Sequence, residues 1–346
     1  MVCLLRRYHI DFIFRGIRPF AIYLFPILMK RLLLKSLFLA LALYLTVAAG
    51  AYLCRRELDS NNYLSVIVDK HKRLESLPSP RLIFIGDSAL PFGLDGGRIE
   101  KELKIPVANM GLHAAFGLPF IFEEIYSDLR PGDIVAAIFH YYPSDKEINK
   151  GVVCHALDFY PAMYQRLELN YFSKKKLETT CDIKRIRRYL LNKIFRANPS
   201  GGIEVKGNEF GYRRWAFNEF GDVYDDLHKT SNVKFSTGSI IKFDAKQSET
   251  LALLNYYDKI FGEKGAKLLM IYPPHPETNF NNVSKEINEF DKLLMKGTKI
   301  RILSKPSDSV YADNYFFNTD YHLTSSGKKL YTDFVINIVK KEMEYE

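Results

Sequence analysis

RLIFIGDS, residues 81–88, is the stretch that decides the fold of this chain. A short apolar run that ends in turn residues is typical of a strand buried on both faces, as in a parallel sheet. Four further segments resemble strands, and segments with helical spacing lie between them. The further strands are expected at residues 107–112, 132–142, 267–276 and 299–303, and helices at 95–104, 116–128, 246–262 and 325–342. This alternation predicts an α/β fold whose parallel sheet is covered by helices on both faces.

Residues 145–245 interrupt the alternation of strands and helices. This segment is rich in Lys, Arg, Tyr and Phe and contains the single tryptophan of the chain, Trp215. We interpret it as an insertion beside the carboxyl edge of the sheet, where open α/β folds bind ligands. Its aromatic side chains either stack on sugar rings or pack the insertion onto the core.

The net charge of +9 is concentrated at the N-terminus. Residues 1–35 contain seven basic residues and one acidic residue, which leaves a net charge of only +3 for the rest of the chain. A basic stripe across a folded domain is the pattern expected of a nucleic-acid-binding protein. The charge here forms a flank instead, so we expect no nucleic-acid partner.

Residues 36–54, SLFLALALYLTVAAGAYLC, contain no charged side chain. At ~1.5 Å per residue, a helix of this length crosses a hydrocarbon core of ~30 Å. The sequence therefore predicts a single transmembrane helix in the cytoplasmic membrane. The basic tail, residues 1–35, is expected to stay in the cytoplasm, and the rest of the chain to lie outside, in the periplasm or beyond.

Two alternatives concern the N-terminal region. The apolar segment is also compatible with a cleaved signal peptide. The sequence from Met29 has the features of a complete membrane-targeting N-terminus, so residues 1–28 are either a tail or an upstream start. Residues 55–80 are polar and contain prolines, which predicts a stalk that leads to a domain over residues 81–346.

Of the four cysteines, Cys154 and Cys181 lie in the domain expected outside the cytoplasm, whereas Cys3 and Cys54 lie in or before the apolar segment. Disulfides form and persist in oxidising compartments. Cys154 and Cys181 are therefore expected either to form a disulfide or to be two separate buried thiols.

Gly86-Asp87-Ser88 directly follows the first strand of the domain. A serine at this position projects its hydroxyl from the carboxyl edge of the sheet, and a following helix N-terminus favours developing negative charge. Its alternative role is to cap that helix. A serine nucleophile needs a base, and the candidate is His322, between the last strand and the last helix. Asp320 is predicted to orient its imidazole.

These segments resemble the SGNH (GDSL-like) hydrolase superfamily. The resemblance rests on GDS, on Asp320-Tyr-His322-Leu and on Asn109-Met-Gly111, and it covers about residues 80–130 and 265–342. It implies a flavodoxin-like α/β/α sandwich, an acyl-Ser88 intermediate, and an oxyanion bound by the N–H groups of Ser88 and Gly111. The usual spacing in the superfamily is D-x-x-H. The D-x-H spacing found here is more similar to that of the SGNH-fold proteins of bacterial exopolysaccharide acetylation.

One block of the family pattern is missing. The third strand ends in Phe139-His140-Tyr141-Tyr142-Pro143, without the expected asparagine. Either His140 or Asn218 supplies the third oxyanion donor, or His140 only packs at the strand end. Asp87, Asn109 and His275, the last in a Tyr-Pro-Pro-His-Pro strand end, are further candidates for substrate contacts.

No metal-ligand spacing and no phosphate-binding glycine loop occurs, so we expect neither a metal nor a cofactor. The sequence predicts an esterase or O-acyltransferase that acts on acyl groups, such as O-acetyl, of a cell-envelope or exported polysaccharide. Hydrolysis and transfer differ only in whether water or a sugar hydroxyl resolves the acyl-enzyme. The alternative is a catalytically inactive scaffold, or a glycan-binding partner of a multi-span membrane acyltransferase.

Overall fold

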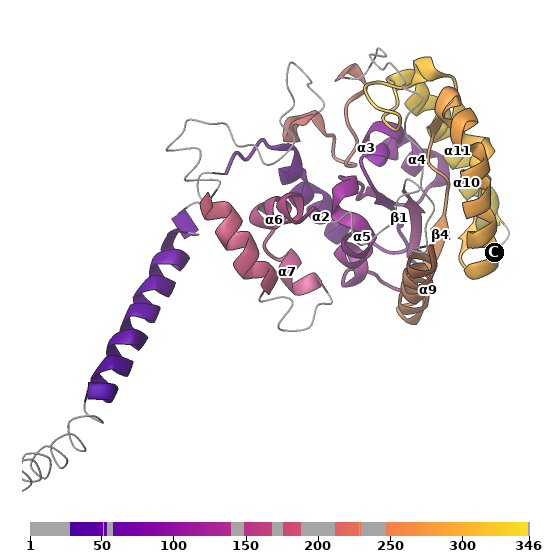
Figure 1. The fold of residues 1–346 in the computed structure, drawn as a ribbon. Coiled ribbons are helices and arrows are strands. Elements are labelled where there is room, and N and C mark those ends of the chain that lie inside the picture. Colours follow the sequence, from indigo (N-terminus) through magenta and orange to yellow (C-terminus); the bar gives the residue numbers. More distant parts are fainter. Residues whose placement is uncertain are drawn as a thin grey trace, which may run out of the picture. The chain divides into compact units, whose positions relative to one another are not determined.

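The computed structural model of the chain consists of two compact units, residues 1–57 and residues 58–346. Figure 1 shows the arrangement of the elements within them. The structure describes residues 28–50, 52–53, 58–139, 149–167, 176–187, 212–227, 229 and 247–344.

The first unit contains an apolar helix over Leu28–Gly50. The helix has 23 residues, and an 18-residue window of it has a mean hydropathy of 2.1, so it is long and apolar enough to span a membrane or to be a signal sequence. The predicted apolar helix is thus confirmed, but it begins before Ser36, because Lys30, Arg31 and Lys35 are themselves good helix formers. Residues 1–27 lie outside the described part of the chain.

The second unit is built on a five-stranded sheet with the order β2-β1-β3-β4-β6. All four neighbouring pairs are parallel. The strands are β1 Leu82–Gly86, β2 Val107–Asn109, β3 Ile134–Ile138, β4 Lys267–Met270 and β6 Arg301–Ile302. Each lies within, or overlaps, a segment predicted to be a strand, so the predicted α/β fold with a parallel sheet is confirmed.

Helices cover both faces of this sheet (Figure 1). Ile83 and Ile85 of β1 join one buried core with residues of α2, α5 and α9, while Leu82 and Phe84 join a second core with residues of α4 and α11. Alternate residues of a strand point to opposite faces, which explains the division. The helices are α2 Ile67–Ser76, α4 Gly96–Leu103, α5 Gly117–Tyr126, α9 Gln247–Glu263, α10 Glu277–Gly297 and α11 Ser325–Glu344.

The predicted stalk over residues 55–80 is wrong over most of its length. Residues 63–76 form η1 (Tyr63–Val66) and α2, and Leu64, Ile67 and Leu74 are fully buried. Spacings of three and seven residues place these apolar side chains on one helix face, which packs into the core. The segment therefore belongs to the domain.

The described parts of the insertion are α6 (Lys150–Phe159), α7 (Met163–Arg166), a helix over residues 176–187, and residues 212–227. A disulfide joins Cys154 to Cys181. Of the two alternatives for these cysteines, the disulfide is therefore the one observed.

Residues 212–225, here called the central strap, are hydrogen-bonded to the core at several points. The buried Lys70 ammonium donates to the Gly221 carbonyl at 2.7 Å. The Asp222 carboxylate accepts from the N–H of Gly96 at 2.6 Å. The Val223 N–H donates to the Pro91 carbonyl at 2.9 Å. These contacts fix the strap against the elements that follow β1.

The remaining elements are short. They are α3 Ala89–Gly93, β5 His275–Pro276, β7 Val310–Tyr311, η2 Ala114–Phe116, η5 Arg214–Ala216, η6 Asp225–Leu227, η7 Pro306–Ser309 and η8 Asp313–Tyr315. Strands β5 and β7 pair in parallel and form a separate two-stranded sheet.

Candidate active site

Ser88 lies on the tight turn between β1 and α3. Gly86, which precedes the turn, is required by close packing, since a Cβ atom there would lie 1.7 Å from the Ile138 carbonyl oxygen of β3. The Asp87 carboxylate accepts from the Ala89 N–H at 2.8 Å and so caps the turn. The Ser88 side chain makes no capping hydrogen bond. Its alternative role as a helix cap is therefore excluded.

His322 meets Ser88 although 234 residues separate them. Its Nε2 lies 2.9 Å from the serine Oγ. The two residues are 2% and 9% exposed, so the contact is largely shielded from water. The imidazole stacks on the Phe92 ring of α3 with 4.2 Å between ring centroids. The 2.9 Å between Nε2 and the serine Oγ is within the range that a general base needs to take a proton from a hydroxyl.

The residue that binds Nδ1 of His322 is Asn318, not Asp320. The Oδ1 atom of Asn318 lies 2.9 Å from Nδ1. The Asp320 carboxylate instead accepts from the side chain of Asn279 at 3.1 Å. Thr319 Oγ1 accepts from the N–H groups of residues 321 and 322, and this closed turn brings positions 318 and 322 together. The predicted contact of Asp320 with the imidazole is therefore wrong, and Asn318 makes that contact instead.

Tyr212 of the central strap makes a second contact with the imidazole. Its hydroxyl lies 2.9 Å from Nδ1 of His322 and accepts from the Asn318 amide at 3.1 Å. For Nε2 to accept the serine proton, the imidazole must carry its own proton on Nδ1. The Asn318 Oδ1 can only accept, so its contact with Nδ1 favours that tautomer, and the Tyr212 oxygen can accept from the same N–H.

Gly111 brings the loop after β2 close to the turn of Ser88. A Cβ atom at Gly111 would lie 2.4 Å from the Leu90 Cβ and 2.7 Å from the Asp87 carbonyl oxygen. The Gly111 N–H donates to Asn109 Oδ1 at 3.1 Å, and the Asn109 amide donates to Asp222 at 2.7 Å. Asn109 thus braces this loop and the strap. The oxyanion role of Gly111 stays a prediction, because it requires Asn109 to release this N–H.

Other residues that the sequence singled out have different outcomes. His140 lies outside the described residues, so its predicted role is not tested. The side-chain oxygen of Asn218 accepts from the N–H groups of Phe220 and Asp222, which forms a turn. His275 is buried in β5, opposite Val310. Neither residue's observed contacts indicate an oxyanion donor or a substrate contact.

Two tyrosines, the buried Tyr63 and the half-buried Tyr321, lie near Asp87. Burial, together with the negative charges of Asp87 and Asp320, raises the pKa of Tyr321 to about 12. Burial also raises the pKa of Tyr63 well above its ordinary value, and its hydroxyl donates to the Leu112 carbonyl at 2.6 Å. Both phenols therefore stay neutral near pH 7 and add no charge to the site.

His113 also lies near Asp87. Burial lowers the pKa of its imidazole, and the charge of Asp87 only partly opposes this effect. Its Nδ1 accepts from the Ala115 N–H at 3.0 Å. No spacing in the sequence distinguishes His113 from a structural histidine, and its observed bond caps η2.

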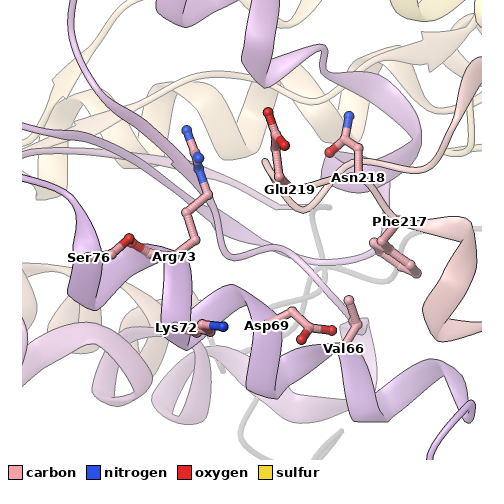
Figure 2. Close-up of a pocket in the computed structure, with 8 residues that line it drawn as sticks. All are labelled: Val66, Asp69, Lys72, Arg73, Ser76, Phe217, Asn218 and Glu219. Atoms are coloured by element: carbon pink, nitrogen blue, oxygen red, sulfur yellow. The ribbon is translucent and has the colours of Figure 1, made fainter.

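A separate cavity of about 420 Å³ lies between the strap, η1 and α2. Figure 2 shows the side chains that line it: Val66, Asp69, Lys72, Arg73, Ser76, Phe217, Asn218 and Glu219. Arg214 donates to both oxygens of Asp69, at 2.6 and 2.7 Å. Arg73 donates to the Val107 carbonyl at 2.7 Å and to Glu100 at 2.8 Å. Much of the charge around this cavity is thus neutralised within the protein.

His71, Glu75 and Asp128 are close enough together to hold a metal ion. Arg166 already pairs with both carboxylates, at 2.7 Å from Glu75 and in closer contact with Asp128. The guanidinium therefore supplies the positive charge of this cluster, and a metal would have to displace it. Since Arg166 pairs with both carboxylates, we do not assign a metal to this cluster of described residues.

Comparison with known proteins gives no match, either to a protein-family model or to a curated protein sequence. The character of the site therefore follows from its geometry. A serine hydroxyl and an imidazole meet at the carboxyl edge of a parallel α/β sheet, and an amide and a phenol bind the far side of the imidazole.

Proposed function

We propose that the chain is a serine esterase or O-acyltransferase of the SGNH type, with Ser88 as nucleophile and His322 as base. The observation that carries the proposal is the 2.9 Å contact between Ser88 Oγ and His322 Nε2. The sheet order supports it, since β2-β1-β3-β4-β6 is 2-1-3-4-5 in chain order, which is the flavodoxin-like order. In such sheets, ligands bind at the carboxyl edge, where Ser88 lies.

The proposed reaction has two steps. Ser88 Oγ attacks the acyl carbonyl carbon while His322 Nε2 takes the hydroxyl proton, and the N–H groups of Ser88 and Gly111 bind the oxyanion. The imidazolium then protonates the leaving alkoxide, which departs as the alcohol and leaves acyl-Ser88. Water or a sugar hydroxyl attacks this ester with His322 again as base, which releases the acid or the transferred ester and restores the serine.

The expected location is outside the cytoplasm. The Cys154–Cys181 disulfide supports it, because disulfides persist in oxidising compartments. The apolar helix Leu28–Gly50 supports attachment to a membrane, with the basic flank on the cytoplasmic side. An enzyme in this position meets the O-acyl groups of envelope or exported polysaccharides, which we take as its substrate class.

The proposal is tested with the full chain purified in detergent. We expect hydrolysis of p-nitrophenyl acetate and release of acetate from acetylated polysaccharide, and we expect both to be lost in Ser88→Ala and His322→Ala. Ser76→Ala is the matched control, since this serine is exposed and its hydroxyl donates to the Arg73 carbonyl of its own helix. Turnover by Ser88→Ala at the wild-type rate would contradict the proposal.

A second candidate is a glycan-binding or scaffold protein that assists a multi-span membrane acyltransferase. Two observations favour it: the Gly111 N–H is bound by Asn109, and a neutral amide occupies the place of the orienting carboxylate. If wild type and Ser88→Ala both lack turnover but bind acetylated polysaccharide equally, this second function is the correct one.

A further inference from the structure

The hydroxyl of Tyr212 completes a triangle of hydrogen-bonding groups behind the base. It lies 2.9 Å from Nδ1 of His322, and the Asn318 side chain donates to it at 3.1 Å. The third side is the 2.9 Å contact between Asn318 Oδ1 and Nδ1. Asn318 and His322 share one turn, whereas Tyr212 comes from the central strap, 110 residues away from the histidine.

A neutral amide needs such a partner more than a carboxylate does. Either end of an asparagine side chain can face an imidazole, and only its oxygen can accept the Nδ1 proton. With the NH₂ group toward Nδ1, the imidazole would carry its proton on Nε2 and could not accept the proton of Ser88. The Tyr212 oxygen accepts from the NH₂ group of Asn318 and so keeps it directed away from Nδ1.

The same oxygen also stabilises the charged base. When His322 takes the serine proton, the imidazolium carries a positive charge that a carboxylate would normally neutralise. Here the carbonyl dipole of Asn318 and the phenol oxygen of Tyr212 both face the Nδ1 proton. Two neutral acceptors thus share the stabilisation that one carboxylate usually provides.

The strap holds Tyr212 in a fixed place. The tyrosine ring packs beside Tyr63 and Phe92, with 5.5 and 5.6 Å between centroids. Phe92, whose ring also stacks on the imidazole, belongs to α3, and this helix begins directly after Ser88. The Val223 N–H binds the Pro91 carbonyl of the same helix. The nucleophile turn, the base and the strap therefore share one packing unit.

We propose that Tyr212 is a positioning residue that, together with Asn318, replaces the orienting carboxylate of the Ser–His unit. This inference rests on the proposed function, and it assigns a catalytic purpose to the insertion. The strap supplies a hydroxyl without which the amide of Asn318 can turn and the base can lose its active tautomer.

Tyr212→Phe tests the inference, because it removes the hydroxyl and keeps the ring that packs in the core. We expect kcat/KM for p-nitrophenyl acetate to fall about 10-fold, with little change in KM, since Tyr212 acts through the base. The acid limb of the pH profile should move to lower pH, because the imidazolium loses an acceptor. Tyr224→Phe, in the half-exposed part of the same strap, is the control and should match wild type within about twofold.

A second background makes the test specific. In Asn318→Asp the orienting group cannot present an NH₂ end, and its charge stabilises the imidazolium without help. The Tyr212→Phe change should therefore cost less than about threefold in that background. An equal cost in both backgrounds would mean that the hydroxyl serves packing alone, and the inference would be overturned.

A measurement independent of turnover separates this inference from the proposed function. NMR of the full chain with ¹⁵N-labelled histidine reports the tautomer and titration of His322, assigned by loss of its signals in His322→Gln. The ring centroids of Tyr321 and His322 are 4.7 Å apart, and the charges of Asp87 and Asp320 act on Tyr321. These three groups are the titratable neighbours that can affect the titration of His322. We expect the Nδ1–H tautomer in wild type, and in Tyr212→Phe a lower His322 pKa with a share of Nε2–H. If Tyr212→Phe leaves the tautomer and the pKa of His322 unchanged, the inference is refuted. If both change as expected in a protein that has no esterase activity, the inference is supported and the proposed function is contradicted.

Discussion

Replacing Asn318 with alanine removes two hydrogen bonds behind the imidazole of His322. The Asn318 side chain accepts from Nδ1 at 2.9 Å and donates to the Tyr212 hydroxyl at 3.1 Å. At about 1 kcal/mol for each bond, the loss is ~2 kcal/mol, which is about 30-fold at ~1.4 kcal/mol for each factor of ten. We expect kcat/KM to fall by about this factor, while KM stays nearly constant.

The matched control for this change is Asp320→Ala, two residues further along the same turn. The Asp320 carboxylate bonds Asn279, so its removal should change kcat/KM less than about threefold. Initial rates with p-nitrophenyl acetate, and the rate at which a fluorophosphonate labels Ser88, are compared for both variants. A larger loss in Asp320→Ala than in Asn318→Ala would refute the reasoning and return the orienting role to the aspartate.

Two further predictions concern the stability of the domain. Asp133→Asn leaves the fully buried Arg81 without its carboxylate, which should lower the free energy of unfolding by about 3–5 kcal/mol in urea titrations. Burial raises the pKa of Asp133, but hydrogen bonds from Arg81 and Ser79 outweigh burial and lower it. The ionised carboxylate therefore stabilises the fold above about pH 4, and this contribution is lost as the pH falls further. In Asp133→Asn the free energy of unfolding should depend less on pH in this acid range. Replacing both Cys154 and Cys181 with serine opens a loop whose ends are 27 residues apart. The chain-entropy relation then predicts that the free energy of unfolding falls by about 3.5 kcal/mol. An unchanged unfolding midpoint would contradict either prediction.

The sheet could be predicted because its strands are local patterns. RLIFIG and the later apolar runs are short, buried on both faces and bounded by turn residues. Ser88 and His322 could be paired for the same reason, since Ser88 directly follows β1 and His322 lies in the connection from β6 to α11, and the carboxyl ends of parallel strands share one sheet edge. The predicted stalk is wrong because the polar residues and prolines near 77–80 are a more visible signal than the helical spacing of Leu64, Ile67 and Leu74.

The contacts behind the base could not be predicted in this way. Asp320 and Asn318 are both near His322 in sequence, and the turn closed by Thr319 decides which side chain reaches Nδ1. Nothing in the sequence around Tyr212 indicates its contact, because the position of its hydroxyl depends on packing between the strap, η1 and α3. Its only signal was the aromatic content of residues 145–245.

A neutral orienting group is consistent with how deeply this base is buried. His322 is 2% exposed and is stacked on Phe92, and Asn318 beside it is half-buried, so an aspartate at position 318 would carry a charge with reduced access to water. Such a partly buried charge has a desolvation cost unless it is paired. The amide of Asn318 and the phenol of Tyr212 avoid that cost, but they stabilise the imidazolium less than a carboxylate does. Asn318→Asp should therefore raise the pKa of His322 and lower the stability of the fold, a trade-off that one titration and one unfolding curve can measure.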